Sequence, residues 1–308
     1  MIKNAIKKIA GLILILIIIS FFVFLLMYIA PGDPAEKRLT SQGVVVTKEI
    51  LDSERERLGL LKPFFVRYGE WLIAVIQGDF GVSFKDDLPV APKLWNALTK
   101  TVILSSTSLI LSLLVSYPLA LLSALRKNQL ADYIVRLFSF IGNSLPNFLI
   151  SVMLMYFFCI KLSLFSVIAT GDLKGLIMPV LSLSIPMTAK FIRQMRTDFL
   201  EELEEDYIVG MKGRGVGERY IVINVLRNTL GNIFIIIALQ IGSLMGGSVV
   251  IETIFRWPGI GALVMESIDA RDYPVIMGFV LIMGTIYVLI NQLSDILCKF
   301  LDPRKSYE

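Results

Sequence analysis

The sequence contains no histidine, and this absence removes the usual imidazole ligand for metals and the usual proton relay near neutral pH. Cysteine is almost as scarce, since Cys159 and Cys298 are the only two, and they lie far apart in apolar runs. Such positions favour two buried thiols over a disulfide or a metal pair. Charge is also low: 18% of the residues are charged, where soluble domains have about 25%. The net charge of +4 gives no indication of a nucleic-acid partner.

Apolar residues, by contrast, make up 55% of the 308 residues, and the mean hydropathy is +0.72. Six apolar stretches approach or exceed the ~20 residues that a helix needs to cross a bilayer. They are residues 9–30, 102–125, 137–160, 175–192, 230–251 and 275–298. The first is longer than the core of a secretory signal, so we expect it to be a retained span. The sequence therefore predicts an all-α membrane protein with about six transmembrane helices, in a single domain over residues 1–308.

The fourth stretch is the weakest of the six. It contains Pro179, Pro186 and Lys190. Proline inside a span, including Pro118 and Pro146 elsewhere, is tolerable because neighbouring helices can satisfy the freed carbonyl groups. The lysine is expected near the end of the span, where its head can reach the interface.

Basic residues in the short connections predict the orientation of the chain. With the N-terminus inside, sixteen Lys and Arg residues fall on the inner side and four fall in the short outer loops. Both termini are therefore expected in the cytoplasm.

The outer segment 31–101 is expected to be a short helical extracellular insertion. Thr47 can cap a helix over residues 48–58, which Gly59 would close. A second helix is predicted from Pro63 to near Gly78, where apolar residues recur at helical spacing. This second helix is too short and too charged to span, so we expect it on the outer face. It is either a docking or gating element or a packed cap.

Acidic residues are nearly absent from the predicted spans, since Glu252 and Asp295 sit toward helix ends. A proton- or sodium-coupled carrier usually needs a carboxylate within the membrane. The sequence also has no Walker-type phosphate loop and no serine, cysteine or metal constellation that supports catalysis. We therefore expect a chain that is not an enzyme and that binds no metal or cofactor itself. If it drives transport, the energy comes from a partner.

The segment 193–227, between the fourth and fifth spans, is the most informative connection. An acidic run over residues 201–206 is followed by a glycine-punctuated stretch over residues 210–217. A cytoplasmic loop of this length and mixed charge is typical of a docking site for a soluble protein. A solvated helix pair without a partner is the alternative.

Within this loop, Asp206-Tyr207-Ile208, Gly215 and Leu226-Arg227-Asn228 resemble the coupling loop of ABC importer permeases in the dipeptide, oligopeptide and nickel branch. The resemblance covers essentially the whole chain. Further motifs that match in the same order are Pro31-Gly32-Asp33-Pro34, Leu58-Gly59-Leu60, Gly78-Asp79-Phe80-Gly81, Trp257-Pro258-Gly259, Arg271-Asp272-Tyr273-Pro274 and Asp302-Pro303-Arg304. Several independent motifs in order make this resemblance specific.

The chain departs from the wider permease pattern at one point, where Val209-Gly210-Met211 stands in place of the Glu-Ala-Ala triplet. Each glycine in this region (Gly210, Gly213 and Gly215) would weaken a free helix by about 1 kcal/mol relative to alanine. Either contact with an ATPase orders this helix or close backbone packing requires the glycines. The sequence leaves both explanations open.

The resemblance implies a type I ABC importer permease fold in a prokaryotic cell (inner) membrane. It implies a permease subunit that forms the translocation pathway of an ATP-driven, binding-protein-dependent importer. The implied partners are a second homologous permease subunit, two ATP-binding subunits that carry ATP and magnesium, and an extracellular or periplasmic substrate-binding protein. Membrane lipid surrounds the chain, and no nucleic acid is expected. The implied substrate is nickel, free or chelated, or a di- or oligopeptide, and the motifs are most similar to nickel-type permeases.

Three sets of residues are expected to serve this function. The ATPase-coupling set is Glu205, Asp206, Tyr207, Gly210, Gly213, Gly215, Arg227 and Asn228. The set expected to line the pathway or to pack closely is Gly242, Ser243, Gly246, Gly247 and Ser248. The external gate or docking set is Glu252, Trp257, Pro258, Gly259 and Asp272.

Two other classes of function are considered as alternatives. One is a secondary transporter or channel that acts alone, which uptake into vesicles without ATP or partners would favour. The other is a membrane scaffold or receptor without transport. Co-purification with a Walker-containing ATPase, together with ATP-dependent uptake, would count against it.

Overall fold

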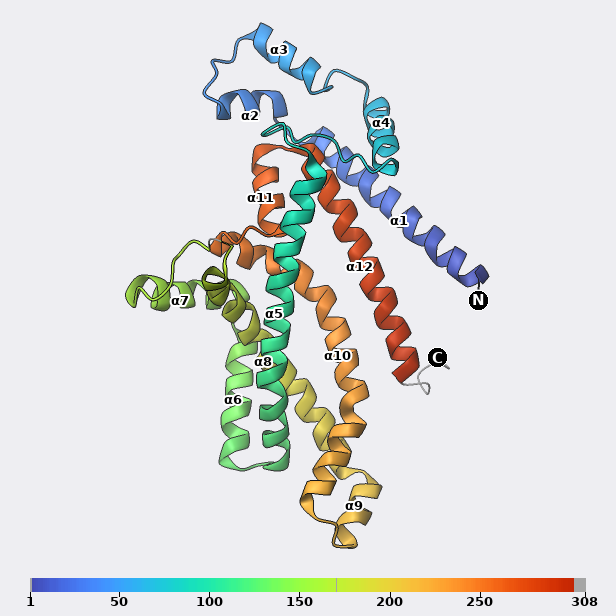
Figure 1. Cartoon of the computed structure of the whole chain (residues 1–308), viewed down its shortest axis with the longest axis vertical. Coiled ribbons are helices and arrows are strands. Elements are labelled where there is room, and N and C mark those ends of the chain that lie inside the picture. Colours follow the sequence, from blue (N-terminus) through green and yellow to red (C-terminus); the bar gives the residue numbers. More distant parts are fainter. Residues whose placement is uncertain (1, 170, 302–308) are drawn as a thin grey trace. The chain divides into compact units, whose positions relative to one another are not determined.

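The computed structural model describes residues 2–169 and 171–301, without the side chains of residues 2–10, 243, 245 and 294–301. The described part is helical, and its strand-like pairing is one isolated β-bridge between Val82 and Pro89 (Figure 1). The elements are α1 (Ile2–Ile29), α2 (Pro34–Ser41), α3 (Lys48–Arg57), α4 (Phe64–Ile76), α5 (Val90–Leu125), α6 (Leu130–Ser144), α7 (Asn147–Leu154), the π-helix η1 (Met155–Lys161), α8 (Leu173–Glu204), α9 (Asp206–Gly213), α10 (Glu218–Phe255), α11 (Ile260–Ala270) and α12 (Tyr273–Leu301). The all-α prediction is confirmed. The Asp302-Pro303-Arg304 motif and the side chains of Asp295 and Cys298 lie outside the described part.

Five helices are long and apolar enough to cross a membrane, and the number rises to seven if each of two bent helix pairs is counted as one span. The six predicted spans fall within this range. The helices run beyond the apolar stretches, and α5 begins at Val90 rather than near residue 102. The reason is that Lys93 and Asn96 lower the local hydropathy without interrupting the helix.

The third predicted span, over residues 137–160, is not one continuous helix. The segments Leu130–Ser144 and Asn147–Lys161 are bent relative to each other by 102°. Pro146 causes the break, because it lacks a backbone N–H and favours extended conformations in the residue before it. Leu145 accordingly has ψ 133°. The expectation that Pro146 is tolerated within a span is therefore wrong, because the helix ends before it.

The chain divides into two compact units. The first unit contains the chain up to residue 100 together with residues 259–289, and the second contains residues 101–258 and the chain from residue 290.

In the second unit, α8 is the most buried of the candidate spans. Within its most apolar window 67% of the residues are buried, against 33% or less in the other four spans. Phe191 and Phe199 of α8 pack with Ala124 of α5 and Val225 of α10 in one apolar core. This burial explains why the fourth stretch reads as weakly hydrophobic, since its side chains contact protein rather than lipid.

Lys190, which was expected near the end of its span, has a partner on a neighbouring helix. Its Nζ atom donates a hydrogen bond of 2.8 Å to Oε1 of Gln240 on α10. A polar group in a membrane-spanning region is tolerated when such a partner satisfies it. A second contact in this unit depends on a small residue, because a Cβ atom added at Gly142 of α6 would lie 2.8 Å from the Cβ atom of Ala189 on α8.

A buried carboxylate fastens the turn between α5 and α6 to α8. Asp132 has no exposed surface, and its carboxylate accepts hydrogen bonds from Nε and Nη2 of Arg196, at 2.8 and 2.9 Å. The hydroxyl of Ser123 and the backbone N–H of Asn128 also donate to it. All four donors stabilise the ionised form, so this cluster holds α5, α6 and α8 together.

In the first unit, α4 packs on α1 through aromatic side chains. Phe64 and Tyr68 of α4 contact Phe21 and Phe24 of α1 with ring centroids 5.3–5.8 Å apart. The hydroxyl of Tyr68 also lies 3.0 Å from Oγ of Ser20. These edge-on ring pairs are favourable beyond the area that they bury. Within the chain, α4 therefore has the contacts of a packed cap.

The remaining short helices agree closely with expectation. The first, α3, begins after Thr47, whose hydroxyl accepts a hydrogen bond from the N–H of Ile50, and Gly59 follows it with φ +67°. The second, α4, begins one residue later than predicted, because Pro63 is its N-cap rather than part of its first turn. The sequence analysis did not predict α2 or α11.

Charged side chains join α2, α3 and the turn around the β-bridge. The guanidinium of Arg38 pairs with Glu54 at 3.1 Å and with Asp87, and Arg57 pairs with both of these acids. Hydrogen bonds from Arg38, and then from Arg57, lower the pKa of Asp87 to about 2. The network is therefore fully charged at neutral pH.

We expect Asp132→Ala to lower the free energy of unfolding by about 3–5 kcal/mol, because it leaves the guanidinium of Arg196 without its buried counter-ion. The measurement is the thermal melting of the purified full chain in a neutral detergent. Glu70→Ala is the matched control, since the Lys62–Glu70 pair has both side chains more than half exposed and contributes about 1 kcal/mol or less. Equal melting shifts for the two variants would contradict the anchoring role of Asp132.

Candidate functional site

The predicted coupling loop forms a short helix, α9, between α8 and α10. Glu205, in an extended conformation with ψ 143°, separates α8 from α9. Gly215 closes α9 with φ +73°, a left-handed conformation that favours glycine. The backbone N–H groups of Gly215 and Val216 then bond back to the carbonyls of Lys212 and Met211, at 3.0 and 3.1 Å. This turn directs the chain into α10.

One side of α9 is seated on the core of the second unit. Ile208 is fully buried and packs in the same apolar cluster as Phe199, Ile221 and Val225. These four side chains come from α8, α9 and α10. The short helix is therefore fixed to the ends of two long helices by apolar contact.

A polar cluster beside Ile208 joins the same three helices. The hydroxyl of Tyr207 donates a hydrogen bond to Oε1 of Glu202, and Nδ2 of Asn228 donates to that same oxygen and to the tyrosine oxygen, both at 2.9 Å. Partial burial, and then the bond to Glu202, raise the pKa of Tyr207 to about 12. At neutral pH the phenol thus keeps the proton that it donates.

The other side of α9 is open. Val209 is 57% exposed, and a Cβ atom added at Gly210 or Gly213 would have no neighbouring atom within 4 Å. Neither of these two glycines has the positive φ that Gly215 has. Of the two explanations that the sequence left open, close packing within this chain therefore does not account for Gly210 and Gly213.

The structure brings only part of the predicted coupling set together. Tyr207 and Asn228 form a hydrogen bond, whereas Arg227 is exposed on α10. Glu205 and Asp206 are exposed at the start of α9, where negative charge is favourable to the helix dipole. Sequence reasoning missed Glu202, although it lies in the acidic run, because its contacts depend on the turn after α8.

The predicted pathway set lies on α10. Gly246 and Gly247 have no atom within 4 Å of an added Cβ, so no close contact with another element of the described chain accounts for them. Gly242 is half-buried and Ser248 is fully buried. The side chain of Ser243 lies outside the described part of the structure.

The predicted gate or docking residues divide between the two compact units. In the second unit, Glu252 is fully buried and accepts a hydrogen bond of 2.6 Å from the hydroxyl of Thr101. Trp257 is 1% exposed within an apolar cluster, and its backbone N–H donates a hydrogen bond of 2.9 Å to the carbonyl of Glu252. Pro258 is exposed. Glu252 and Trp257 are therefore internal residues of their unit.

Asp272 and Gly259 belong to the first unit, and Gly259 is the buried N-cap of α11. Asp272 is 1% exposed and accepts hydrogen bonds from the hydroxyl of Ser83 and, at 2.9 Å, from the N–H of Phe84. The adjacent Arg271 donates to the carbonyls of residues 31 and 32. This short segment thus organises the loops of the first unit.

Among the side chains that the structure describes, no three Cys, Asp or Glu residues gather in a group that could hold a metal ion. Cys159 is a free, buried thiol.

Comparison with known proteins decides the family. Residues 116–307 match the family described as binding-protein-dependent transport system inner membrane component, and residues 1–105 match its N-terminal membrane component. The chain belongs to this family. It is a multi-pass inner-membrane permease of a binding-protein-dependent ABC importer and a non-catalytic subunit of that system. The resemblance seen in its motifs is confirmed.

Curated relatives of this permease extend over almost its full length. Nickel import system permease protein NikB from Staphylococcus aureus strains bovine RF122 / ET3-1, MRSA252 and USA300 is in each case 36% identical over 305 residues. The match covers 99% of this permease and 92% of each relative.

Replacing Ile208 with alanine should loosen α9, because it removes fully buried methyl groups and leaves a cavity beneath the helix. We expect a loss of about 2–5 kcal/mol in the local stability of α9, measured by amide hydrogen exchange of residues 206–213 in the purified permease. Val209→Ala, at the exposed neighbouring position, is the control and should leave exchange nearly unchanged. Faster exchange in the control than in Ile208→Ala would show that the seat of α9 is assigned wrongly.

Proposed function

We propose that this permease imports nickel, free or chelated, through a pathway that it encloses with a second homologous permease subunit. The observation that carries the substrate is the 36% identity over 99% of the chain to the nickel import system permease NikB. Di- and oligopeptides are the alternative substrates, because the coupling and outer-loop motifs resemble the peptide and nickel branch as a whole.

In this proposal α9 is the contact with the ATPase subunits. It is rigidly seated on one side by Ile208 and by the Tyr207–Asn228 cluster, and it is open on the other side at Val209, Gly210 and Gly213. A helix with a bare glycine face allows close approach of another protein surface. A movement of the ATPases would then reach α8 and α10 as a rigid displacement and change the balance between inward-open and outward-open packing.

Residues Gly246 and Gly247 are proposed to face the pathway or the second permease. The support is that neither glycine packs closely against another element of the described chain. Small residues at helical spacing let two helices, or a helix and a substrate, come close together in a membrane. Ser243 and Ser248 would add hydroxyl groups on the same stretch of α10.

The outer residues are proposed to serve the external gate and the surface that receives the binding protein. Glu252 and Trp257 would stiffen the outer end of α10 from inside its core, since both are buried. Asp272 would hold the loops of the first unit in the shape that the binding protein recognises. Exposed Pro258 is the member of this set that can touch a partner directly.

The proposed orientation places both termini and α9 in the cytoplasm. It is supported by the sixteen Lys and Arg residues on that side against four in the short outer loops. Two ATP-binding subunits with their magnesium would then dock from inside, and the substrate-binding protein would dock from outside.

The substrate is tested by uptake of radioactive nickel into membrane vesicles that contain the assembled importer, its binding protein and internal ATP. The proposal expects ATP-dependent uptake of nickel. A chelated form of nickel should either be taken up itself or compete with free nickel, and excess dipeptide should leave the uptake of nickel unchanged. Inhibition by dipeptide in parallel with dipeptide uptake would assign the transporter to peptides instead. Uptake by this chain alone, without ATP, would identify a secondary carrier.

The coupling proposal predicts a specific defect for Gly210→Leu. The new side chain enters open space and improves helix propensity, so insertion and folding should be kept, but it would obstruct a closely docked ATPase. We expect the substrate-stimulated ATP hydrolysis of the assembled importer to fall at least tenfold.

Gly11→Leu is the matched control, because it adds the same side chain at another open helical glycine, within the apolar span of α1. Its stimulated hydrolysis should equal that of the wild type. Wild-type stimulation of ATP hydrolysis by substrate in the Gly210→Leu importer would contradict the proposal that α9 contacts the ATPase.

A further inference from the structure

A pocket of about 530 Å³ lies between α6 and α8 in the second unit. It is outside the coupling, pathway and gate sets described above. The residues that line it combine three arginines with hydroxyl and amide groups and with apolar side chains. They are Tyr133, Arg136, Leu137, Ser139, Phe140, Asn143, Ser144, Ile192, Arg193, Arg196 and Thr197.

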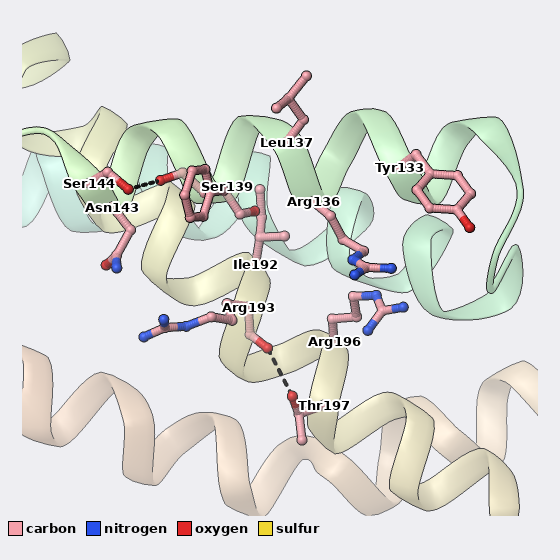
Figure 2. A pocket seen from close by; sticks show the side chains of 11 residues that line it. Tyr133, Arg136, Leu137, Ser139, Asn143, Ser144, Ile192, Arg193, Arg196 and Thr197 are labelled. Carbon is pink, nitrogen blue, oxygen red and sulfur yellow. Dashed lines mark hydrogen bonds between the residues drawn. The ribbon is translucent and has the colours of Figure 1, made fainter.

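The charge of this pocket is positive. Figure 2 shows the guanidinium groups of Arg136 and Arg196 extending toward each other from facing helices, with Arg193 reaching toward the side where Asn143 lies. Asp132 neutralises Arg196, and no acidic residue lines the pocket. Within the described part of the chain, Arg136 and Arg193 form no ion pair. Two uncompensated guanidinium groups therefore face one cavity.

Two like charges that share a pocket repel each other, and an anion between them relieves this repulsion. Guanidinium groups present several N–H donors in a plane and bind phosphate oxygens in pairs, which makes arginine well suited to a phosphate group. The amide of Asn143 lies in the same lining and adds a neutral hydrogen-bond donor, whereas the hydroxyl of Ser144 already donates to the carbonyl of Phe140 at 2.7 Å. The polar side of the pocket therefore fits a phosphate group.

The face of α6 beside the arginines is apolar and uncovered within the chain. Ile134, Leu137, Phe140 and Ile141 are 50–71% exposed, and Leu137 and Phe140 also line the pocket. In a membrane such a surface contacts acyl chains. A cationic pocket that opens beside an acyl-compatible surface is suited to a molecule with a phosphate head and hydrocarbon tails.

The pocket also lies beside the second half of α8. Arg193 and Arg196 follow the apolar part of α8 and precede its connection to α9. In the orientation proposed above, this part of α8 is at the cytoplasmic boundary of the membrane. Basic pockets between transmembrane helices on that side bind the head groups of anionic lipids.

We propose that the pocket between α6 and α8 binds the phosphodiester head group of an anionic phospholipid of the inner leaflet. Arg136 and Arg193, which line the pocket, supply the positive charge that attracts the phosphate, and the acyl chains lie along the exposed apolar face of α6. The lipid thereby braces α6 against α8, the helix that leads to α9.

The test uses the full chain purified in a neutral detergent. Native mass spectrometry follows the binding of phosphatidylglycerol and of phosphatidylcholine with the same acyl chains, and thermal melting gives a second readout. We expect phosphatidylglycerol to bind more tightly and to raise the melting temperature more. In the double variant Arg136→Gln/Arg193→Gln, its binding should weaken about tenfold or more, while phosphatidylcholine binding stays the same.

Arg126→Gln/Arg219→Gln is the matched control, because it removes two exposed arginines that lie outside the pocket and in the same unit. This control should keep the preference for phosphatidylglycerol. Arg193→Gln alone serves as the milder variant if the double variant melts early in phosphatidylcholine, and it should still weaken phosphatidylglycerol binding severalfold.

Three outcomes would overturn the proposal. The first is the absence of any preference for the anionic lipid in the wild type. The second is an equal loss of binding in the pocket variants and in the control, which would indicate a general effect of charge. The third is binding of glycerol 3-phosphate or inorganic phosphate as tight as that of phosphatidylglycerol, which would identify a soluble anion as the occupant.

Discussion

Polar groups inside a membrane are stabilised by partners within the protein, and α8, the most buried of the candidate spans, has such partners for two of its charged side chains. On this helix Lys190 bonds to Gln240, and Arg196 bonds to the buried carboxylate of Asp132. The aromatic side chains of Phe191 and Phe199 fill the core between these polar contacts. The helices α5, α6 and α10 pack around α8, because each of them contributes residues that contact it.

The same helix gives α9 its mechanical position. Since α8 ends immediately before α9, and Ile208 and Tyr207 fix α9 to the ends of α8 and α10, a displacement of α9 cannot be absorbed by a slack connection. Rigid seating on one side and bare glycines on the other are the features that a coupling element needs. The proposed lipid site at Arg136 and Arg193 would act on α8 from another direction, so the inner leaflet and the ATPases would both bias the same helix.

Particular residues show how far sequence reasoning reached. The Thr47 cap, the closing Gly59 and the set of apolar spans were predictable, because capping, glycine conformation and hydropathy are local properties. The break at Pro146 was predictable only in principle: proline permits either a kink or an end, and the surrounding packing decides between them. Glu202 was missed because its partners, Tyr207 and Asn228, come close to it only through the turn between α8 and α9 and the turn between α9 and α10.

By itself the sequence determined the class of protein and the family, and it predicted six spans, which falls within the range of five to seven in the structure. Long apolar runs and the order of motifs can be recognised without knowing any contact. The tertiary structure alone decided which polar residues are internal. It showed that Glu252 and Trp257 are buried and that Gly210 and Gly213 are not needed for packing within the chain. The physical reason is that burial depends on neighbours distant in sequence. The role of a side chain in a membrane protein depends on whether protein, lipid or a partner lies against it.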